Sequence, residues 1–396
     1  SKDEISVLAE TINQMTQGLV KAATASKDLT VGKEVQKMYI PLEKDAGGKK
    51  LTTGKETNKH VEFFGYYEGA KGVSGDYFDF LKIDEKHYAI IKCDVAGKGV
   101  PAALIMVEVA TIFLTYFREW SVKKQGVHID QLAYRINDLL EERGFKGRFA
   151  ALIIVIMNME TGTCYLCNAG DNIIHLFDRG KRQMIQKILP EAPAAGVFPS
   201  MLVEMQSGFK QIPLKLTAGD CMFLFTDGIE EAKRIFRDQA FKPITCQEPG
   251  LKDGELHETH PRSSGDEELG IPRIYDIINS VMDRKKYSLY KYHNPVENEV
   301  LTFDFTTCEG TIEEAILAMV SVEKIFRIYP DPSATGENKI IVDRKVDEFL
   351  KAHFDQYRDY FSHLLDGGPV TEYVHFSHLK EDEQYDDLTI LGIKKL

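Results

Sequence analysis

The sequence predicts an α+β fold in which β-sheets are covered by α-helices. Short apolar runs rich in β-branched residues are separated by turn residues, as is typical of strands. These runs lie at 61–67, 78–83, 88–93, 149–157, 163–168, 173–177, 212–216 and 221–225, and a last run lies at 388–393. Two helical segments stand next to each other between the third and fourth runs. This grouping favours sheets covered by helices over alternating βαβ units.

The two central helical segments differ in their apolar pattern. Residues 101–117 are apolar nearly all round and have Pro101 at a favourable first helical position, so this helix is expected to be buried against a sheet. Residues 129–143 are more amphipathic. Further helices are predicted at 229–236, 271–286, 311–326 and 342–365.

The N-terminal segment carries a heptad-like seam. Its apolar residues recur at alternating spacings of three and four, the a/d pattern of a coiled coil. They are Ile5, Leu8, Ile12, Met15 and Leu19. The pattern leaves two interpretations open: a coiled coil, or an amphipathic helix that packs on its own domain. A second helix is predicted from Val31 to Pro41, which cannot continue it, and the Gly/Lys/Thr-rich segment 45–59 is predicted to be a flexible loop.

Composition narrows the function classes. With 396 residues the chain has room for two or three domains or for one enlarged domain. The net charge of −12 argues against a general nucleic-acid binder, because nothing offsets phosphate repulsion over the whole surface. The six cysteines are scattered, mostly inside apolar runs, which indicates a reducing cytosolic compartment. No apolar run approaches the length of a membrane span, so the chain as given is expected to be soluble.

Four aspartates stand where a strand-like run meets a loop. They are Asp76, Asp94, Asp227 and Asp386, each in a glycine-flanked or paired-acid turn. Mg²⁺ and Mn²⁺ prefer such oxygen ligands. Two ions of this kind can turn a bound water into a nucleophile and clamp a phosphoryl group. The pattern therefore predicts a metal-dependent phosphatase, although each Asp-Gly turn taken alone is more often a turn or a helix cap.

The order of the acidic turns and their flanking residues resembles the type 2C metal-dependent protein phosphatases. Within them it resembles the bacterial branch named for the sporulation stage II phosphatase. The matching segments are 72–79, 94–106, 147–151, 168–170, 225–232 and 386–389. The resemblance covers about 60–236 and roughly the last dozen residues.

This resemblance implies a fold and a set of roles. The fold would be a sandwich of two packed antiparallel sheets flanked by helices, in α-β-β-α order. Asp94 would bridge two Mn²⁺ or Mg²⁺ ions, and the main-chain carbonyl of Val95 would bind one of them. Asp76 would hold the second ion, while Asp227 and Asp386 would hold the first, and a water between the ions would attack phosphorus. The neighbouring Asp387 stays open as an alternative ligand to Asp386.

The chain departs from the family pattern in two places. Asp171 stands where many relatives have a histidine after Asn-Ala-Gly, and it is assigned no role. The gap between Asp227 and Asp386 is roughly 150 residues, longer than usual in this branch. The expected division is a relay helix at 1–28, a linker helix and loop at 29–59, and a phosphatase domain at 60–396 with an insertion at about 287–375.

Residues 3–15 resemble the last helix of a HAMP relay, which follows a transmembrane helix in bacterial receptors. We therefore expect the cytoplasmic output domain of an inner-membrane protein, dimeric through its N-terminal helix. By family analogy its substrate would be a phosphorylated anti-sigma-factor antagonist of the STAS type, in a partner-switching cascade. Two alternatives remain: a catalytically silent phosphatase-like binding module, and a two-metal nuclease or phosphodiesterase, which the acidic charge disfavours.

Overall fold

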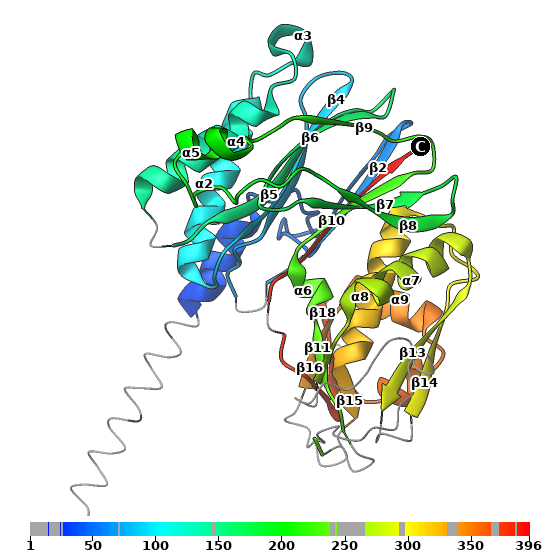
Figure 1. Cartoon of the computed structure of the whole chain (residues 1–396). Coiled ribbons are helices and arrows are strands. Elements are labelled where there is room, and N and C mark those ends of the chain that lie inside the picture. The colour runs from blue at the N-terminus through cyan, green and yellow to red at the C-terminus, as the bar shows by residue number, and fades with distance from the viewer. Residues whose placement is uncertain are drawn as a thin grey trace, which may run out of the picture.

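The computed structural model has two antiparallel sheets packed face to face, with helices on both outer sides (Figure 1). It describes residues 15, 24, 27–69, 72–144, 147–237, 242–243, 266–292, 298–330, 339–365, 372–384 and 386–396. The predicted α+β sandwich is therefore confirmed. The N-terminal seam lies outside the described residues apart from Met15.

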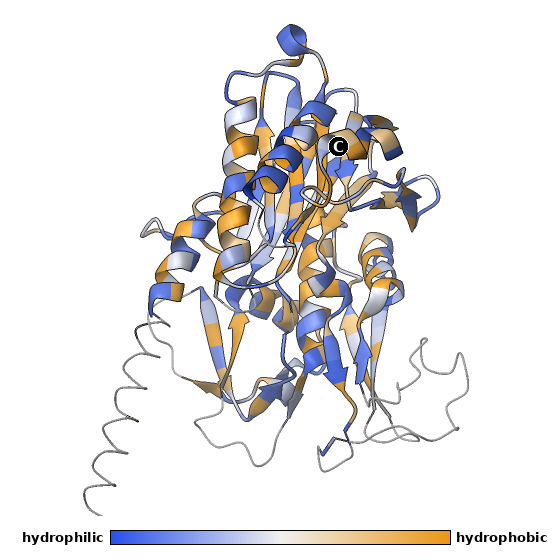
Figure 2. Cartoon of the chain, turned by 60° about the vertical axis from the view of Figure 1, so that its left-hand side comes forward, coloured by the Kyte–Doolittle hydropathy of each residue, from blue (hydrophilic) through white to orange (hydrophobic). Residues whose placement is uncertain are grey.

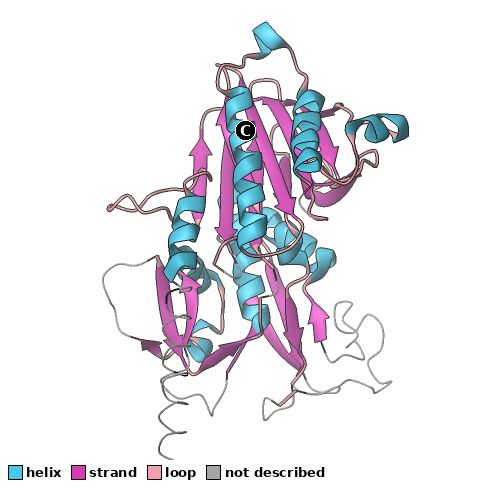
Figure 3. Cartoon of the chain, turned by 90° about the vertical axis from the view of Figure 1, so that its left-hand side faces the viewer, coloured by secondary structure: helices cyan, strands magenta, loops and turns pink. Residues whose placement is uncertain are grey.

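The first sheet has five strands in the order β3-β4-β5-β6-β9. Their bounds are β3 Tyr77–Lys82, β4 His87–Val95, β5 Ala150–Asn158, β6 Thr163–Ala169 and β9 Ile212–Lys215. Helices α2 (Val100–Phe117) and α4 (Ile129–Arg143) cover its outer face (Figure 3). By length and composition α2 is apolar enough to cross a membrane, contrary to the sequence expectation, but here it contributes eight buried residues to the core.

The second sheet has six strands in the order β1-β2-β20-β10-β7-β8. Their bounds are β1 Thr53–Thr57, β2 Val61–Glu68, β20 Leu388–Lys395, β10 Cys221–Phe225, β7 Ile173–Asp178 and β8 Gln183–Ile188. The C-terminal strand β20 lies between β2 and β10, so the end of the chain is built into the middle of the sheet. Its neighbour β10 ends at Phe225, just before the predicted site residue Asp227.

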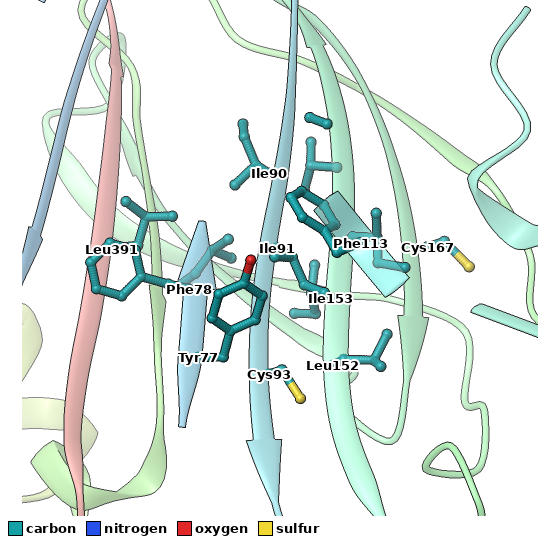
Figure 4. Packing of buried hydrophobic residues seen from close by; sticks show 14 of the residues in the cluster. Tyr77, Phe78, Ile90, Ile91, Cys93, Phe113, Leu152, Ile153, Cys167 and Leu391 are labelled. Atoms are coloured by element: carbon teal, nitrogen blue, oxygen red, sulfur yellow. The ribbon is translucent and has the colours of Figure 1, made fainter. Parts of the chain in front are cut away.

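The core between the sheets is aromatic and β-branched. Phe63 of β2 stacks on Phe80 of β3 with ring centroids 5.0 Å apart, which joins the two sheets directly. Figure 4 shows Phe78 and Leu391 on the side of the second sheet, and Phe113 of α2 packed on the other side of β4 and β5. Apolar residues follow these strands and the inward sides of the helices (Figure 2).

A second apolar core lies on the outer face of the six-stranded sheet. Helices α7 (Gly270–Asp283) and α8 (Ile312–Arg327) pack on this face and on each other. Gly392 of β20 lets α8 approach closely, because a Cβ there would lie 2.4 Å from a side-chain carbon of Ile312. Thus α8, which lies inside the expected insertion at 287–375, completes the outer layer of the sandwich.

The remaining elements surround these layers. In the segment after α7 they are β13 Lys286–Tyr292, β14 Asn298–Asp304, β15 Ile328–Pro330, β16 Lys339–Asp343, α9 Arg344–His353, α10 Tyr357–Tyr360, β17 Leu364–Leu365, β18 Tyr373–Ser377 and β19 Leu379–Glu381. Elsewhere they are α3 Val122–Gln125, α5 Ser200–Gln206, α6 Asp227–Glu230, β11 Lys233–Ile235 and β12 Asp266–Glu268, and a helix also covers 27–37.

Three sequence predictions of local structure are wrong. The loop predicted at 45–59 contains β1, an edge strand whose polar residues gave no apolar signal. The helix predicted at 229–236 is the short α6 followed by β11, because this segment pairs with β12. The single helix predicted at 342–365 divides into α9 and α10, and the end of β16 precedes them.

Candidate metal centre

Asp76 lies in the loop that leads into β3, and the residue is 3% exposed. Its backbone N–H donates to Ser74 Oγ at 2.9 Å, which closes the loop on itself. Thr226, at the end of β10, donates from its hydroxyl to Asp76 Oδ2 at 2.7 Å. A hydrogen bond between residues 150 positions apart therefore joins the first and third acidic turns.

Asp94 lies near the end of β4, and a tight glycine turn follows it. Gly97 has a φ of 91°, and a Cβ there would lie 2.0 Å from Arg148 Nη1. Arg148 uses this space to donate to the Ala96 carbonyl at 2.9 Å. On the other side, a Cβ at Gly75 would lie 2.8 Å from the Val95 carbonyl oxygen, so the Asp76 loop passes directly against this carbonyl.

Asp227 begins α6, immediately beyond β10. The next residue, Gly228, lies directly against the backbone of Asp387. A Cβ at this position would lie 1.9 Å from the Asp387 carbonyl oxygen, so the close approach requires a glycine. The pairing of β10 with β20 continues into this region, where the Thr226 N–H donates to the Thr389 carbonyl at 3.0 Å. Strand pairing thus brings the third and fourth acidic turns together.

The paired acids have different surroundings. Asp387 is 6% exposed, and its Oδ2 accepts a hydrogen bond of 3.1 Å from the Gly75 N–H. The Asp386 side chain is 29% exposed and forms an ion pair of 3.0 Å with Lys98, in the glycine turn after β4. Asp386 therefore faces the Asp94 turn, whereas Asp387 anchors the Asp76 loop.

The carboxylates raise one another's pKa values. Burial is the largest cause at Asp76, and the charges of Asp94 and Asp387 raise its pKa further. Burial, followed by the charge of Asp227, raises the pKa of Asp94 to about 6, despite the opposing effect of Lys92. Burial and then Asp386 raise the pKa of Asp227. The predicted ligands thus form one region of concentrated negative charge.

This donor set fits a hard divalent cation, because carboxylate and carbonyl oxygens are what Mg²⁺ and Mn²⁺ bind. In the described part of the chain, no three Asp, Glu, His or Cys side chains are gathered closely enough to hold an ion as they stand. Repulsion among these carboxylates contributes to their raised pKa values. A bound cation would offset the same repulsion, and this would favour cation binding.

A cavity of about 270 Å³ opens beside these acids. Asp94 and Asp227 line one part of it, and Lys92, Asp171 and His175 line another. Lys92 of β4 donates to Asp171 in the turn before β7, and the Lys92 side chain is only 6% exposed. The cavity wall therefore combines carboxylates with a buried ammonium group.

His175 closes the cavity on the side of α7. Its ring stacks on Phe225 with centroids 4.3 Å apart, and its Nδ1 lies 2.7 Å from the Tyr275 hydroxyl. Burial lowers the pKa of His175 to about 4, so its imidazole is neutral at pH 7. This part of the wall adds no charge to the cavity at that pH.

The structure brings together all six residues singled out in the sequence: Asp76, Asp94, Val95, Asp227, Asp386 and Asp387. The sequence analysis missed Lys92 and His175 and gave Asp171 no role. Lys92 did carry a signal, because residues two apart in a strand share a face, and Asp94 follows it by two. The contact of Lys92 with Asp171 spans 79 positions and had no local signal.

Residues 84–258 match the family described as Stage II sporulation protein E (SpoIIE). The match includes Asp94, Val95 and Asp227 and ends before α7. It therefore covers the elements from β4 to β11, whereas β2, β3 and β20 lie outside it.

Two relatives come from Bacillus subtilis (strain 168). Phosphoserine phosphatase RsbU is 27% identical over 214 residues, which cover 54% of this chain and 56% of RsbU. Phosphoserine phosphatase RsbP is 22% identical over 222 residues, which cover 54% of this chain and 52% of RsbP. The chain spans about half the length of these relatives.

Among solved structures, the SiaA-PP2C domain of Pseudomonas aeruginosa is 13% identical, with a TM-score of 0.48. The superposition covers 94% of this chain and 98% of that domain. At this TM-score the similarity supports no conclusion about the chain.

Proposed function

We propose that the chain contains a phosphatase domain of the SpoIIE type, and that this domain is a serine/threonine phosphoprotein phosphatase that depends on Mn²⁺ or Mg²⁺. The observation that carries the proposal is the convergence of four acidic turns from distant parts of the chain. Hydrogen bonds and close glycine contacts join these turns. A charge concentration of this kind beside a cavity suits metal-assisted hydrolysis of a phosphate ester.

The ligand roles follow the acidic turns. In the proposal Asp94 would bridge two ions, and the Val95 carbonyl would bind one of them. Asp76 would hold the second ion, while Asp227 and Asp386 would hold the first, and Asp387 is the alternative to Asp386. When bound, such ions lower the pKa of a coordinated water and offset the charge of the phosphoryl group.

The surrounding residues hold the ligands in position. The Thr226 hydroxyl fixes one oxygen of Asp76, and the Gly75 N–H fixes one oxygen of Asp387. Because both donors are neutral, they orient the carboxylates without cancelling the charge that attracts a cation. Because Gly228 has no side chain, the Asp227 turn and the C-terminal acids can lie in contact at one site.

The substrate class rests on the relatives. RsbU and RsbP are both named phosphoserine phosphatases, which supports a phosphoserine side chain as the reacting group. The finer proposal is a phosphorylated STAS-type anti-sigma-factor antagonist in a partner-switching cascade, and it rests on family analogy alone.

The receptor context is a further part of the proposal. The HAMP-like sequence at 3–15 and the seam at 5–19 support a cytoplasmic output domain of an inner-membrane protein that dimerises through its N-terminal helix. The domain division is part of the same proposal: 1–28, 29–59 and 60–396, with the insertion at about 287–375. Loss of dimerisation on deletion of 1–28 would support this division, whereas an unchanged oligomeric state would contradict it.

Hydrolysis of a phosphoserine peptide tests the activity. We expect turnover that needs added Mn²⁺ or Mg²⁺ and is stopped by a chelator. Asp94→Asn should lower turnover by about a thousand-fold or more, because the proposed bridging carboxylate is lost. Asp359→Asn is the matched control, since Asp359 is an exposed aspartate on α10, outside the four acidic turns.

The outcomes separate the candidate functions. Full activity of Asp94→Asn would contradict the mechanism. Binding of the phosphopeptide without turnover and without Mn²⁺ binding would favour the silent binding module. Cleavage of oligonucleotides would favour the nuclease or phosphodiesterase.

A further inference from the structure

Lys92 and Asp94 line the same cavity from the same strand. They are two residues apart in β4, so their side chains lie on one face of the sheet. Lys92 is 5% exposed, and a lysine buried to this degree normally needs partners for its charge. The proposed metal-binding carboxylate and a buried cation are thus neighbours on one wall.

The ammonium group of Lys92 is held by a carboxylate of the cavity wall. Among the described residues, the carboxylate of Asp171 accepts a hydrogen bond from it. An ammonium group has three N–H donors, so the same group can also donate to an acceptor that enters the cavity.

Carboxylates dominate the cavity wall around Lys92, where Asp94 and Asp171 lie beside it. The other titratable groups that line the cavity are Asp227, Glu230 and His175. Since His175 is neutral at pH 7, Lys92 is the one cation that the described cavity lining offers to an anionic ligand.

A phosphoryl group entering this cavity meets mainly carboxylates. A phosphate monoester carries close to two negative charges at pH 7, so Asp94, Asp171, Asp227 and Glu230 would repel it. A cation fixed in the wall offsets part of this repulsion and leaves the carboxylates available to metal ions. The Asp171 partner holds the ammonium in place, which reduces the entropy lost when a ligand binds.

We propose that Lys92, held in place by Asp171, is a substrate-binding residue whose ammonium group donates hydrogen bonds to a phosphoryl oxygen of the phosphoserine substrate. This inference rests on the proposed phosphatase function and assigns a role to two residues outside the predicted metal ligands. The competing interpretation is that Lys92 is only an internal counter-ion for the carboxylates.

Inorganic phosphate, the reaction product, is the probe that separates the two interpretations. For Lys92→Met we expect the inhibition constant of phosphate and the KM for a phosphoserine peptide to rise by about 10-fold or more, as for loss of a charged hydrogen bond. The affinity for Mn²⁺ should not fall, because the substitution removes a positive charge from beside the acids. Lys92→Arg should recover part of the phosphate affinity, and Asp171→Asn should raise the inhibition constant without removing the cation.

Lys86→Met is the matched control, because Lys86 is a lysine of the same sheet region whose pair with Glu160 is exposed. Unchanged phosphate inhibition in Lys92→Met, together with tighter Mn²⁺ binding, would overturn the proposal in favour of the counter-ion. If Lys92→Met does not fold, unchanged phosphate inhibition in Asp171→Asn would overturn it instead. Isothermal titration with phosphate keeps the test separate from activity: Lys92-dependent binding by a wild-type protein without turnover would support this inference while contradicting the proposed function.

Discussion

At the scale of single residues, the site combines neutral anchors with very few cations. Thr226 and the Gly75 N–H orient Asp76 and Asp387, while the ammonium groups of Lys92 and Lys98 form ion pairs with Asp171 and Asp386. The acids could be predicted from the sequence because each stands where a strand run meets a turn. Their anchors could not be predicted, since the Thr226–Asp76 contact joins residues 150 positions apart.

His175 gives a pH-dependent prediction at this scale. In the unfolded chain it takes up a proton near pH 6.5, whereas in the fold it does so only near pH 4. As pH falls from 6.5 to about 4, protonation therefore favours the unfolded chain, and the contribution of His175 to stability is lost. Over this window the cost approaches about 3 kcal/mol.

The measurement is the free energy of unfolding of wild type and His175→Gln between pH 7 and pH 4.5. Wild type should lose more stability than the variant as pH falls, because glutamine does not titrate. Taking the difference between the two proteins cancels the titration of other groups. Parallel pH profiles would contradict the neutral, buried imidazole.

At the scale of elements, glycine turns bring the strand ends together. The predicted strands agree with β2–β7, β9, β10 and β20 to within two residues at most ends, since each has a clear apolar, β-branched run. Polar edge strands such as β1 and β8 carry no such signal and were missed. The segment 229–236 was misread as one helix because its partner β12 lies more than 30 residues further along the chain.

Gly228→Ala tests the closest of these approaches. A Cβ at this position would lie 1.9 Å from the backbone of Asp387, so the Asp227 turn and the C-terminal acids must separate. We expect a loss of about 1–3 kcal/mol in unfolding free energy, as for other overpacked sites, together with weaker Mn²⁺ binding. Calorimetric titration with Mn²⁺ and denaturant unfolding check both effects.

Gly180→Ala is the control, because a Cβ there would meet only the side-chain Oδ1 of Asp178, at 3.2 Å. If Gly228→Ala bound Mn²⁺ as tightly as this control, the close approach of the two turns would have no bearing on the site.

At the scale of the whole molecule, the chain must return after a long excursion to complete both the sheet and the site. The segment between α7 and β20 supplies α8, which packs on the outer face of the second sheet, before β20 enters beside β10. The sequence predicted the helix at 311–326 but gave no basis for where it would pack. Local periodicity identifies an amphipathic helix, whereas its partner depends on contacts distant in sequence.

The helix at 27–37 connects two distant parts of this molecule. Gln36 Oε1 accepts a hydrogen bond of 2.9 Å from the Ser74 N–H in the Asp76 loop, and the Gln36 amide donates back to the Ser74 carbonyl. The next residue, Lys37, forms a buried ion pair of 2.9 Å with Glu372 of the insertion. A movement of this helix would therefore reach the metal-site loop directly.

Gln36→Ala should weaken Mn²⁺ binding, because the paired hydrogen bonds that hold the Asp76 loop are lost. Two such bonds are worth about 1–3 kcal/mol together, or roughly a 5- to 150-fold change in Kd if the loop is ordered only by the metal in the variant. Titration with Mn²⁺ measures the change, and Glu34→Ala on the same helix is the control, because its side chain is 36% exposed. Equal Kd values for the two variants would show that the Gln36 hydrogen bonds do not influence Mn²⁺ binding.

The central claim is that the four acidic turns form one metal centre. The most direct test is a crystal structure of the protein soaked with Mn²⁺, in which anomalous scattering locates the ions. We expect peaks in contact with Asp94, one of them at Asp76 and the other at Asp227 with Asp386 or Asp387, and the Val95 carbonyl in contact with one of the two. A fully soaked crystal with no peak at Asp94, or with Mn²⁺ bound only elsewhere, would contradict it.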